Sequence, residues 1–268
     1  MTAIALTIAG SDSSGGAGIQ ADLKTFAALG VYGASVITAL TAQNTQGVRG
    51  IHDVPASFIR AQTDAVFSDL DVAAVKIGML SQVATIEAVE QGLVAHSAKN
   101  IVLDPVMVAT SGDRLLAPEA VEALRRKLVP RALVVTPNLP EAAVLVGASV
   151  ARNEREMEVQ AREILALGPR NVLIKGGHGV GDESVDLLIG EGDVVRLSAK
   201  RIVTTSLHGT GCTLSSAVAA GLARGLDLKR AAQEAKTYVT AAIAAARDLN
   251  IGHGHGPLHH FHATWSES

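Results

Sequence analysis

Short apolar runs alternate along the chain with longer segments that have helical patterns. The short runs predict strands at Ile4–Ile8, Ser35–Leu40, Ala73–Ile77, Ile101–Leu103, Leu133–Val135, Val172–Ile174 and Val185–Ile189. The longer segments predict helices that include Ile19–Leu29, Val83–Ala95, Pro118–Leu128 and Glu154–Leu167. This alternation of strands and helices predicts right-handed crossovers and a mainly parallel sheet, so the fold class is α/β.

Three of the predicted strands, in "IVLD", "LVVT" and "VLIK", are apolar throughout, as is typical of strands covered by helices on both faces. The segment "SVDLLIGEGDVVRLSAKRI" predicts a hairpin that turns at Gly190–Gly192. The stretch from Thr210 to Leu249 predicts helix with a break near Gly225. No linker or low-complexity segment interrupts the chain, and we therefore expect a single domain over residues 1–268.

The central strands end in polar residues followed by proline or glycine. Asp104, Lys175 and, a little further on, Asn138 and Glu141 follow three of these strands. Because ligands of parallel sheets bind outside the carboxyl ends of the strands, these side chains are expected to converge on one crevice. Carboxylates suit Mg²⁺ or its water shell, and an ammonium suits phosphate oxygens. The alternative interpretation is that each polar residue merely caps its own strand or, for Asn138 and Glu141, a helix.

The composition excludes several function classes. The 268 residues are 48% hydrophobic but only 3% aromatic, so Ala, Val, Leu and Ile must build the core. The formal net charge is −3 and no long basic run occurs, which argues against a nucleic-acid partner. The chain has no signal-peptide pattern at its start and no apolar run long enough to cross a membrane. Together with a single cysteine, this predicts a cytoplasmic protein.

That cysteine, Cys212, lies in "SLHGTGCTLSSAVAAG", directly after Gly209, Thr210 and Gly211 at the predicted start of a helix. A helix entered through glycines presents unpaired N–H groups, which can stabilise a transferring phosphoryl group. The same field is expected to lower the pKa of a thiol at this position. The competing interpretation is a small buried apolar residue without chemistry.

Three further segments are weaker signals. "GSDSSGGAGIQADLKT" is a glycine-rich turn before a helix, in which Asp22 either complements the helix dipole or faces the crevice. Gln43, in "TALTAQNTQGV", has an amide that can pair with the amino edge of a pyrimidine, or it is a surface residue of a loop. The terminal "IGHGHGPLHHFH" holds five of the nine histidines, and we expect a packed C-terminal arm rather than a metal site.

Seven motifs occur along the chain in the order "AGSDSSGGAGIQADLKT", "TALTAQNT", "VLDPVM", "TPNLPEA", "IKGGH", "HGTGCTLSSA" and "GHGPLHHF". Over nearly the whole chain they resemble the bacterial hydroxymethylpyrimidine/phosphomethylpyrimidine kinases of thiamine biosynthesis. The resemblance implies a ribokinase-like fold, with a central, mostly parallel sheet and helices on both faces. It also implies ATP and Mg²⁺ as cofactors, and a homodimer.

The resemblance also implies roles for individual residues. It implies that the pyrimidine binds to Gln43, Gly10, Asp22, Met79 and Val106. It implies that the nucleotide and its Mg²⁺ bind to Asn138, Glu141, Asp104, Lys175 and Lys236, with Asp104 and Glu141 nearest the metal. Gly209, Thr210 and Gly211 would form the anion hole, and Cys212 would be the general base where related sugar kinases have aspartate. The chain has Ser206-Leu207 before "HGTGC", where family members usually have Asn-Thr or a similar pair.

The implied reaction is phosphoryl transfer from MgATP to 4-amino-5-hydroxymethyl-2-methylpyrimidine and then to its monophosphate. A pyridoxal/pyridoxine kinase of the same superfamily is the nearest alternative, although Gln43 favours the pyrimidine. Two more distant functions are those of a catalytically silent pyrimidine-binding protein and of a sugar kinase. The intact set of Lys175, Asn138, Glu141 and Cys212 argues against the first, and cysteine in place of aspartate argues against the second.

Overall fold

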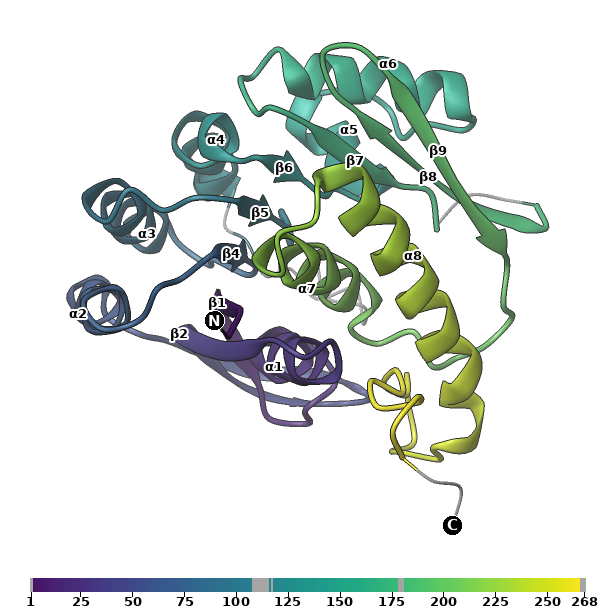
Figure 1. Cartoon of the computed structure of the whole chain (residues 1–268), viewed down its shortest axis with the longest axis horizontal. Coiled ribbons are helices and arrows are strands. Elements are labelled where there is room, and N and C mark those ends of the chain that lie inside the picture. The colour runs from purple at the N-terminus through teal and green to yellow at the C-terminus, as the bar shows by residue number, and fades with distance from the viewer. Residues whose placement is uncertain (1, 108–115, 117, 178–180, 266–268) are drawn as a thin grey trace.

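The computed structural model describes residues 2–107, 116, 118–177 and 181–265. Within these residues, nine strands form one sheet in the order β3-β2-β1-β4-β5-β6-β7-β8-β9 (Figure 1). The strands are β1 (Ile4–Asp12), β2 (Tyr32–Asn44), β3 (Gly47–Asp53), β4 (Ala74–Ile77), β5 (Ile101–Leu103), β6 (Val134–Val135), β7 (Val172–Lys175), β8 (Glu183–Ile189) and β9 (Val194–Lys200). The six central strands, β2, β1, β4, β5, β6 and β7, pair in parallel, whereas β3, β8 and β9 pair antiparallel to their neighbours. This confirms the predicted mainly parallel sheet.

Helices cover both faces of the sheet (Figure 1). They are α1 (Gly18–Ala28), α2 (Ala56–Phe67), α3 (Val83–Ala95), α4 (Pro118–Lys127), α5 (Leu139–Val146), α6 (Glu154–Leu165), α7 (Thr210–Ala223) and α8 (Leu228–Ala245), with short 3₁₀ turns at Val129–Arg131 and Ala246–Asp248. One apolar core lies between the sheet and α2 to α6, and the other between the sheet and α1, α7 and α8. Because side chains of a strand alternate between faces, Val75 and Ile77 of β4 enter the first core and Ala74 the second.

The core on the α7 side holds many small residues where α7 meets α8. Helix α7 buries Ala217, Val218, Ala219 and Ala220 against the sheet and α8. An added Cβ at Gly221 would lie 2.8 Å from Cβ of Ala231 in α8. The two helices are therefore close because neither carries a bulky side chain where they meet.

The N-terminal edge of the sheet differs from the prediction. Strand β2 continues to Asn44 rather than ending at Leu40, because residues 39–44 pair with β3. The pattern of apolar residues predicted neither β3 nor α2. Strand β3 has no buried residue, and α2 buries only Ile59 and Thr63, so neither element carries an apolar stripe.

The C-terminal half agrees with the prediction of helix from Thr210 with a break near Gly225. Helix α7 ends at Ala223, Gly225 has a left-handed φ of +85°, and the side chain of Asp227 caps α8. Among the described residues, no helix is both long and apolar enough to cross a membrane.

The contact between α7 and α8 yields a first prediction. Replacement of Gly221 by valine places two methyl groups against Ala231, and we expect the free energy of unfolding to fall by about 1–3 kcal/mol. Urea denaturation measures this change. Ala244→Val is the matched control, since Ala244 is exposed on α8 and the substitution there adds the same β-branch without a clash. Equal losses in the two variants would show that the contact is not tight.

Candidate active site

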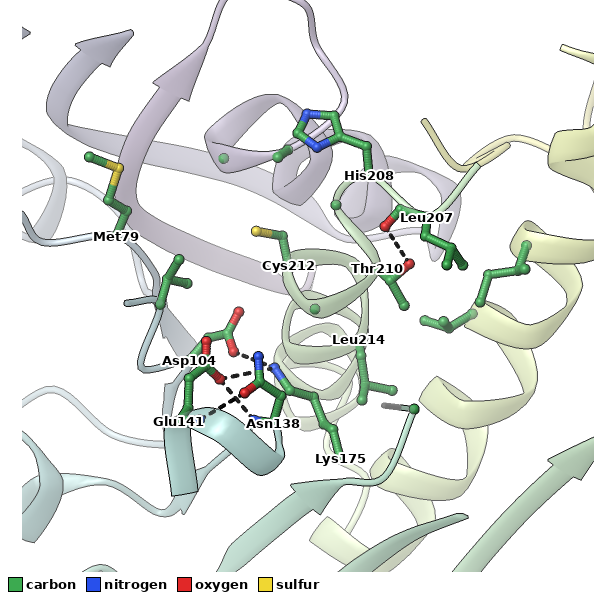
Figure 2. Close-up of a pocket in the computed structure, with 18 of the residues that line it drawn as sticks. Met79, Asp104, Asn138, Glu141, Lys175, Leu207, His208, Thr210, Cys212 and Leu214 are labelled. Carbon is green, nitrogen blue, oxygen red and sulfur yellow. Dashed lines mark hydrogen bonds and ion pairs between the residues drawn. The ribbon is translucent and has the colours of Figure 1, made fainter. Parts of the chain in front are cut away.

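A cavity of about 580 Å³ opens at the carboxyl ends of the parallel strands, a volume within the range of small-molecule sites. Loops after β1, β4, β5 and β7 line it, together with the starts of α5 and α7 and one side of α8 (Figure 2). The predicted site residues that line it are Gly10, Gln43, Met79, Asp104, Val106, Asn138, Glu141, Lys175, Gly209, Thr210, Gly211, Cys212 and Lys236. Asp22 does not line it.

Three charged side chains form a cluster in the wall of the cavity (Figure 2). Nζ of Lys175 donates to Oδ1 of Asp104 at 2.7 Å and lies 4.0 Å from Oε2 of Glu141. Asp104 also accepts hydrogen bonds from the hydroxyls of Thr136 and Ser215, at 3.2 and 3.3 Å. An ammonium held between two carboxylates near open space is suited to meet phosphate oxygens.

The helix cap, which was the alternative interpretation of Asn138 and Glu141, is present as a capping box at the start of α5. The N–H of Asn138 donates to Oε2 of Glu141 at 2.8 Å, and the N–H of Glu141 donates to Oδ1 of Asn138 at 2.9 Å. Burial raises the pKa of Glu141 to about 7. The ammonium of Lys175 only partly offsets this effect, and the nearby carboxylate of Asp104 adds to it. Thus Asn138 and Glu141 cap the helix and line the cavity at the same time.

The donors around Lys175 fit a magnesium ion carried by phosphates rather than a closed protein site. Within the described residues, no cluster of three or more His, Cys, Asp or Glu side chains is suited to a metal. Mg²⁺ commonly takes one or two carboxylates, several waters and substrate phosphate oxygens. Asp104 and Glu141 supply such a pair, since both carboxylates are buried and line the cavity.

The start of α7 has the geometry of an anion-binding turn. Gly209 has a φ of +81°, and a Cβ there would lie 1.9 Å from the carbonyl oxygen of Gly16, so only glycine fits. In the described part of the chain, no acceptor is found for the N–H groups of Gly211 and Cys212. A Cβ at Gly211 would lie 3.1 Å from Nζ of Lys175, so the helix start and this ammonium border the same space.

Cys212 differs from the expectation in one respect. Burial raises the pKa of its thiol to about 11, although the Lys76 ammonium and the N–H of Gly18 act in the opposite direction. The expected lowering by the helix N-terminus was wrong for the ligand-free protein, because loss of hydration outweighs the field of the helix. Cys212 is therefore a neutral thiol at pH 7 before substrates bind.

Asp22 lies below the cavity rather than in its wall. Its carboxylate accepts hydrogen bonds from Thr7 (2.6 Å), Lys76 (2.8 Å) and Ser216 (2.6 Å), and it is fully buried. Lys76, which does line the cavity, was not predicted from the sequence. The only signal was a lysine inside the otherwise apolar strand "AVKI".

A second polar network in the cavity wall, separate from the cluster around Lys175, holds Gln43. Its amide contacts the hydroxyl of Thr41 at 3.0 Å and lies 3.4 Å from Nε2 of His208. Nε2 of His208 in turn lies 2.8 Å from Oδ2 of Asp12. Burial would raise the pKa of Asp12, but hydrogen bonds from His208 and Ser14 prevail and lower it to about 2. Neither Asp12 nor His208 was predicted, although both lie in the motifs that carry the resemblance.

The cavity continues between α7 and α8. Lys236 of α8 donates to Oδ2 of Asp186 at 2.8 Å, and Oδ1 of the same carboxylate accepts from the N–H of Gly176. Beyond this pair the wall is apolar, with Leu214, Val239 and Ile243. A flat aromatic group attached to phosphates would fit this end of the cavity.

Comparison with known proteins agrees with this geometry. The profile of the family described as "Phosphomethylpyrimidine kinase" matches residues 12–259. A hydroxymethylpyrimidine/phosphomethylpyrimidine kinase from Rhizobium meliloti (strain 1021) is 61% identical over 267 residues, which is 100% of both chains. The chain belongs to the phosphomethylpyrimidine kinase family. The predicted family and the prediction of a phosphotransferase are confirmed.

Solved structures of similar proteins confirm the ribokinase-like fold. The phosphomethylpyrimidine kinase from Clostridium difficile 630 is 48% identical, with a TM-score of 0.79 over 90% of this chain and 99% of that one. The pyridoxal kinase from Staphylococcus aureus, solved with AMP-PCP and pyridoxal, is 34% identical. Its TM-score is 0.90, over 98% of this chain and 95% of that one. The backbone is thus shared by kinases of both substrates, while the sequence is closer to the family that acts on the pyrimidine.

The C-terminal residues pack as an arm, as expected. Nε2 of His260 lies 3.0 Å from the hydroxyl of Thr213 in α7, and the N–H of His208 donates to the carbonyl of Gly256 at 3.1 Å. Burial lowers the pKa of His260 to about 4, so this ring is neutral at pH 7. In this kinase family member, the arm therefore supports both His208 and the anion-binding helix.

The raised pKa of Glu141 yields a second prediction. Between pH 4.5 and 7 the unfolded chain has released this proton while the folded protein keeps it, so stability falls as the pH rises. Without nucleotide or metal, we expect the wild type to lose about 1–3 kcal/mol relative to Glu141→Gln between pH 5 and 8. Urea denaturation across this range measures the difference. Glu191→Gln is the control for an exposed carboxylate in the β8–β9 turn, and parallel curves for all three proteins would contradict the assignment.

Proposed function

We propose that the chain transfers the γ-phosphoryl group of ATP to the hydroxymethyl group of 4-amino-5-hydroxymethyl-2-methylpyrimidine, and then phosphorylates the monophosphate. Family membership supports the reaction and the use of ATP. The observation that carries the proposal is the position of Cys212. It stands at a helix start that borders Lys175, between that charged cluster and His208 (Figure 2). His208 in turn lies 3.4 Å from the amide of Gln43.

The pyrimidine binds at the Gln43 end of the cavity. An amide both donates and accepts, so Gln43 matches the amino group and adjacent ring nitrogen of an aminopyrimidine. Its contacts with Thr41 and His208 restrict the rotation of the amide. Gly10, Met79 and Val106 complete the pocket, and a Cβ at Gly10 would lie 3.2 Å from Sδ of Met79. Pyridoxal has a hydroxyl and an aldehyde instead of this amino edge, so the pocket favours the pyrimidine.

The nucleotide binds along the rest of the cavity. Leu214, Val239 and Ile243 contact the base, and Lys236, held by Asp186, lies along the path toward the phosphates. Lys175 binds phosphate oxygens between the nucleotide and the helix start. Asp104 and Glu141 would hold Mg²⁺ directly or through its waters, and the ion would neutralise charge on the phosphates.

Transfer itself needs little covalent chemistry from the protein. The substrate oxygen forms a bond to the γ-phosphorus, the bond from that phosphorus to the ADP oxygen breaks, and ADP leaves. The N–H groups of Gly211 and Cys212 stabilise the charge on the transferring group. The proton of the alcohol passes to the sulfur of Cys212 once the thiol is ionised. Positioning and charge stabilisation supply most of the rate.

Three expectations stay predictions: a homodimer, a cytoplasmic location and a single domain over residues 1–268. Tyr32 of β2 and Phe58 of α2 are exposed aromatic side chains that suit association, but they identify no partner.

Parallel assays test the proposed function. ATP turnover is measured with the pyrimidine alcohol, its monophosphate and pyridoxal under identical conditions. We expect kcat/KM to be at least about tenfold higher for the pyrimidine alcohol than for pyridoxal, since a mismatched polar edge leaves the Gln43 amide unpaired. A higher value for pyridoxal would assign the chain to the alternative activity. Binding of the pyrimidine without ATP turnover would support a silent binding protein.

The role of Cys212 is tested by Cys212→Ala and Cys212→Ser. Loss of a general base lowers kcat by about 10²–10⁴-fold, whereas the KM for the pyrimidine should change little because Gln43 and its network are untouched. The serine variant keeps a hydroxyl of similar shape but cannot form an anion at neutral pH, so it should be as slow as the alanine variant. A kcat near that of the wild type in either variant would remove Cys212 from this role.

A further inference from the structure

One buried ion pair has no part in the chemistry described above. Lys76 and Asp22 are both fully buried, and Nζ of Lys76 lies 2.8 Å from Oδ2 of Asp22. Lys76 shares the face of β4 that carries Ala74, the face covered by α1 and α7. A buried ion pair costs desolvation and is weak evidence for stability. Its retention under an active site therefore calls for a reason other than stability.

The pair lies one helical turn below the sulfur of Cys212. In α7, Cys212 and Ser216 are four residues apart and share a face, as do Gly18 and Asp22 in α1. The two helices contact each other through these matched positions. The N–H of Gly18 acts to lower the pKa of Cys212, and the hydroxyl of Ser216 donates to Oδ1 of Asp22 at 2.6 Å. Lys76 and Cys212 both line the cavity directly above this contact.

We propose that Lys76 and Asp22 are positioning residues that set the ionisation of Cys212: the ammonium of Lys76 stabilises the thiolate, and Asp22 limits how strongly it does so. Asp22 holds the ammonium in place through a network in which Thr7 and Ser216 satisfy the remaining carboxylate positions. The sulfur thus lies above a positive charge that solvent cannot reach or screen.

All the charges around the sulfur agree with this arrangement. Lys76 comes from β4, Asp22 from α1, Asp104 from the end of β5 and Lys175 from the end of β7. After burial, Lys76 is the largest influence on the pKa of Cys212, and it acts to lower it, while Asp22 and Asp104 act to raise it. In return, Asp22 and the sulfur raise the pKa of Lys76, so the lysine stays charged despite its burial.

The consequence for catalysis rests on the proposed role of Cys212 as proton acceptor, but the ionisation itself is measurable without turnover. Cys212 is the only cysteine of the chain, so alkylation by iodoacetamide reports this thiol alone. Below the thiol pKa the alkylation rate is proportional to the thiolate fraction, and a pKa change of about one corresponds to a roughly tenfold change in rate. Rates are measured in the ligand-free protein between about pH 8 and 10, below and around the usual thiol pKa.

Two variants change the charge in opposite ways. Asp22→Asn removes the carboxylate and leaves the Lys76 ammonium free to stabilise the thiolate, so we expect alkylation to be about tenfold faster at fixed pH. Lys76→Met/Asp22→Asn removes both charges, and we expect alkylation to be several-fold slower than in the wild type, since Lys76 has the larger influence. The double variant is used because Lys76→Met alone leaves Asp22 buried without a partner and can fail to fold.

Lys24→Met is the matched control, because Lys24 lies in α1 two residues after Asp22 but its ammonium binds the carbonyl of Gly15 rather than Asp22. It should leave the alkylation rate unchanged, and circular dichroism confirms that each variant is folded. The proposal would be overturned if all folded variants had equal alkylation rates, or if the rates of both test variants changed in the same direction. Either result would show that Lys76 and Asp22 do not set the ionisation of Cys212. If the alkylation rates change as expected but the pH profile of kcat does not change with them, the influence of the ion pair on the thiol is confirmed and the proposed role of Cys212 as proton acceptor is wrong.

Discussion

Helix α7 is held by three hydroxyl groups, and the geometry of the whole site depends on these contacts. Thr213 contacts His260 of the C-terminal arm, Ser215 donates to Asp104 at the end of β5, and Ser216 donates to Asp22 of α1. Each contact joins the helix to a different part of the chain. Over the rest of its buried face, alanines and Gly221 stand beside Leu214, Val218 and Leu222, and this apolar face packs against the sheet and α8. The free N–H groups at its start are thereby fixed relative to Lys175.

The same packing creates two buried charge clusters, one on each side of Cys212. Lys175 with Asp104 and Glu141 lies toward the nucleotide, and Lys76 with Asp22 lies toward α1. In the first cluster, one ammonium lies between two carboxylates. Burial raises the pKa of Glu141, and Lys175 only partly offsets this effect. The ligand-free site therefore favours a neutral Glu141 and a neutral Cys212. In the proposed mechanism both groups ionise before transfer, and ligand binding and catalysis are then linked to proton release.

The substrate is decided by few contacts, because the backbone is common to kinases with different substrates. The pyridoxal kinase of Staphylococcus aureus superposes on this chain with a TM-score of 0.90 at only 34% identity. What can differ on such a backbone is the polar edge presented to the ring. Here that edge is Gln43, held by Thr41 and His208, and His208 is itself held by Asp12 and the C-terminal arm. If the pyrimidine binds at Gln43 as proposed, substrate choice depends on residues from both ends of the chain.

The order of strands and helices, the mainly parallel sheet and the residues that gather at its carboxyl edge could all be predicted from the sequence. Apolar runs, helix breaks and polar residues after strands are local patterns, and the edge at which parallel strands end is a consequence of connectivity. Strand β3 and helix α2 could not be predicted, since each buries too few side chains to leave a periodic pattern.

Only the tertiary structure decided the protonation state of Cys212 and the partners of the buried charged groups. The sequence predicted a lowered pKa for Cys212 from the helix start alone, whereas burial by α1, β4 and the residues around them raises it. The resemblance implied that Asp22 lines the pyrimidine pocket. Instead, hydrogen bonds from Ser216 and Lys76, which are 194 and 54 residues away along the chain, hold its carboxylate below the cavity. Desolvation and the pairing of distant charges depend on the packing of the complete chain, so no short segment of sequence contains them.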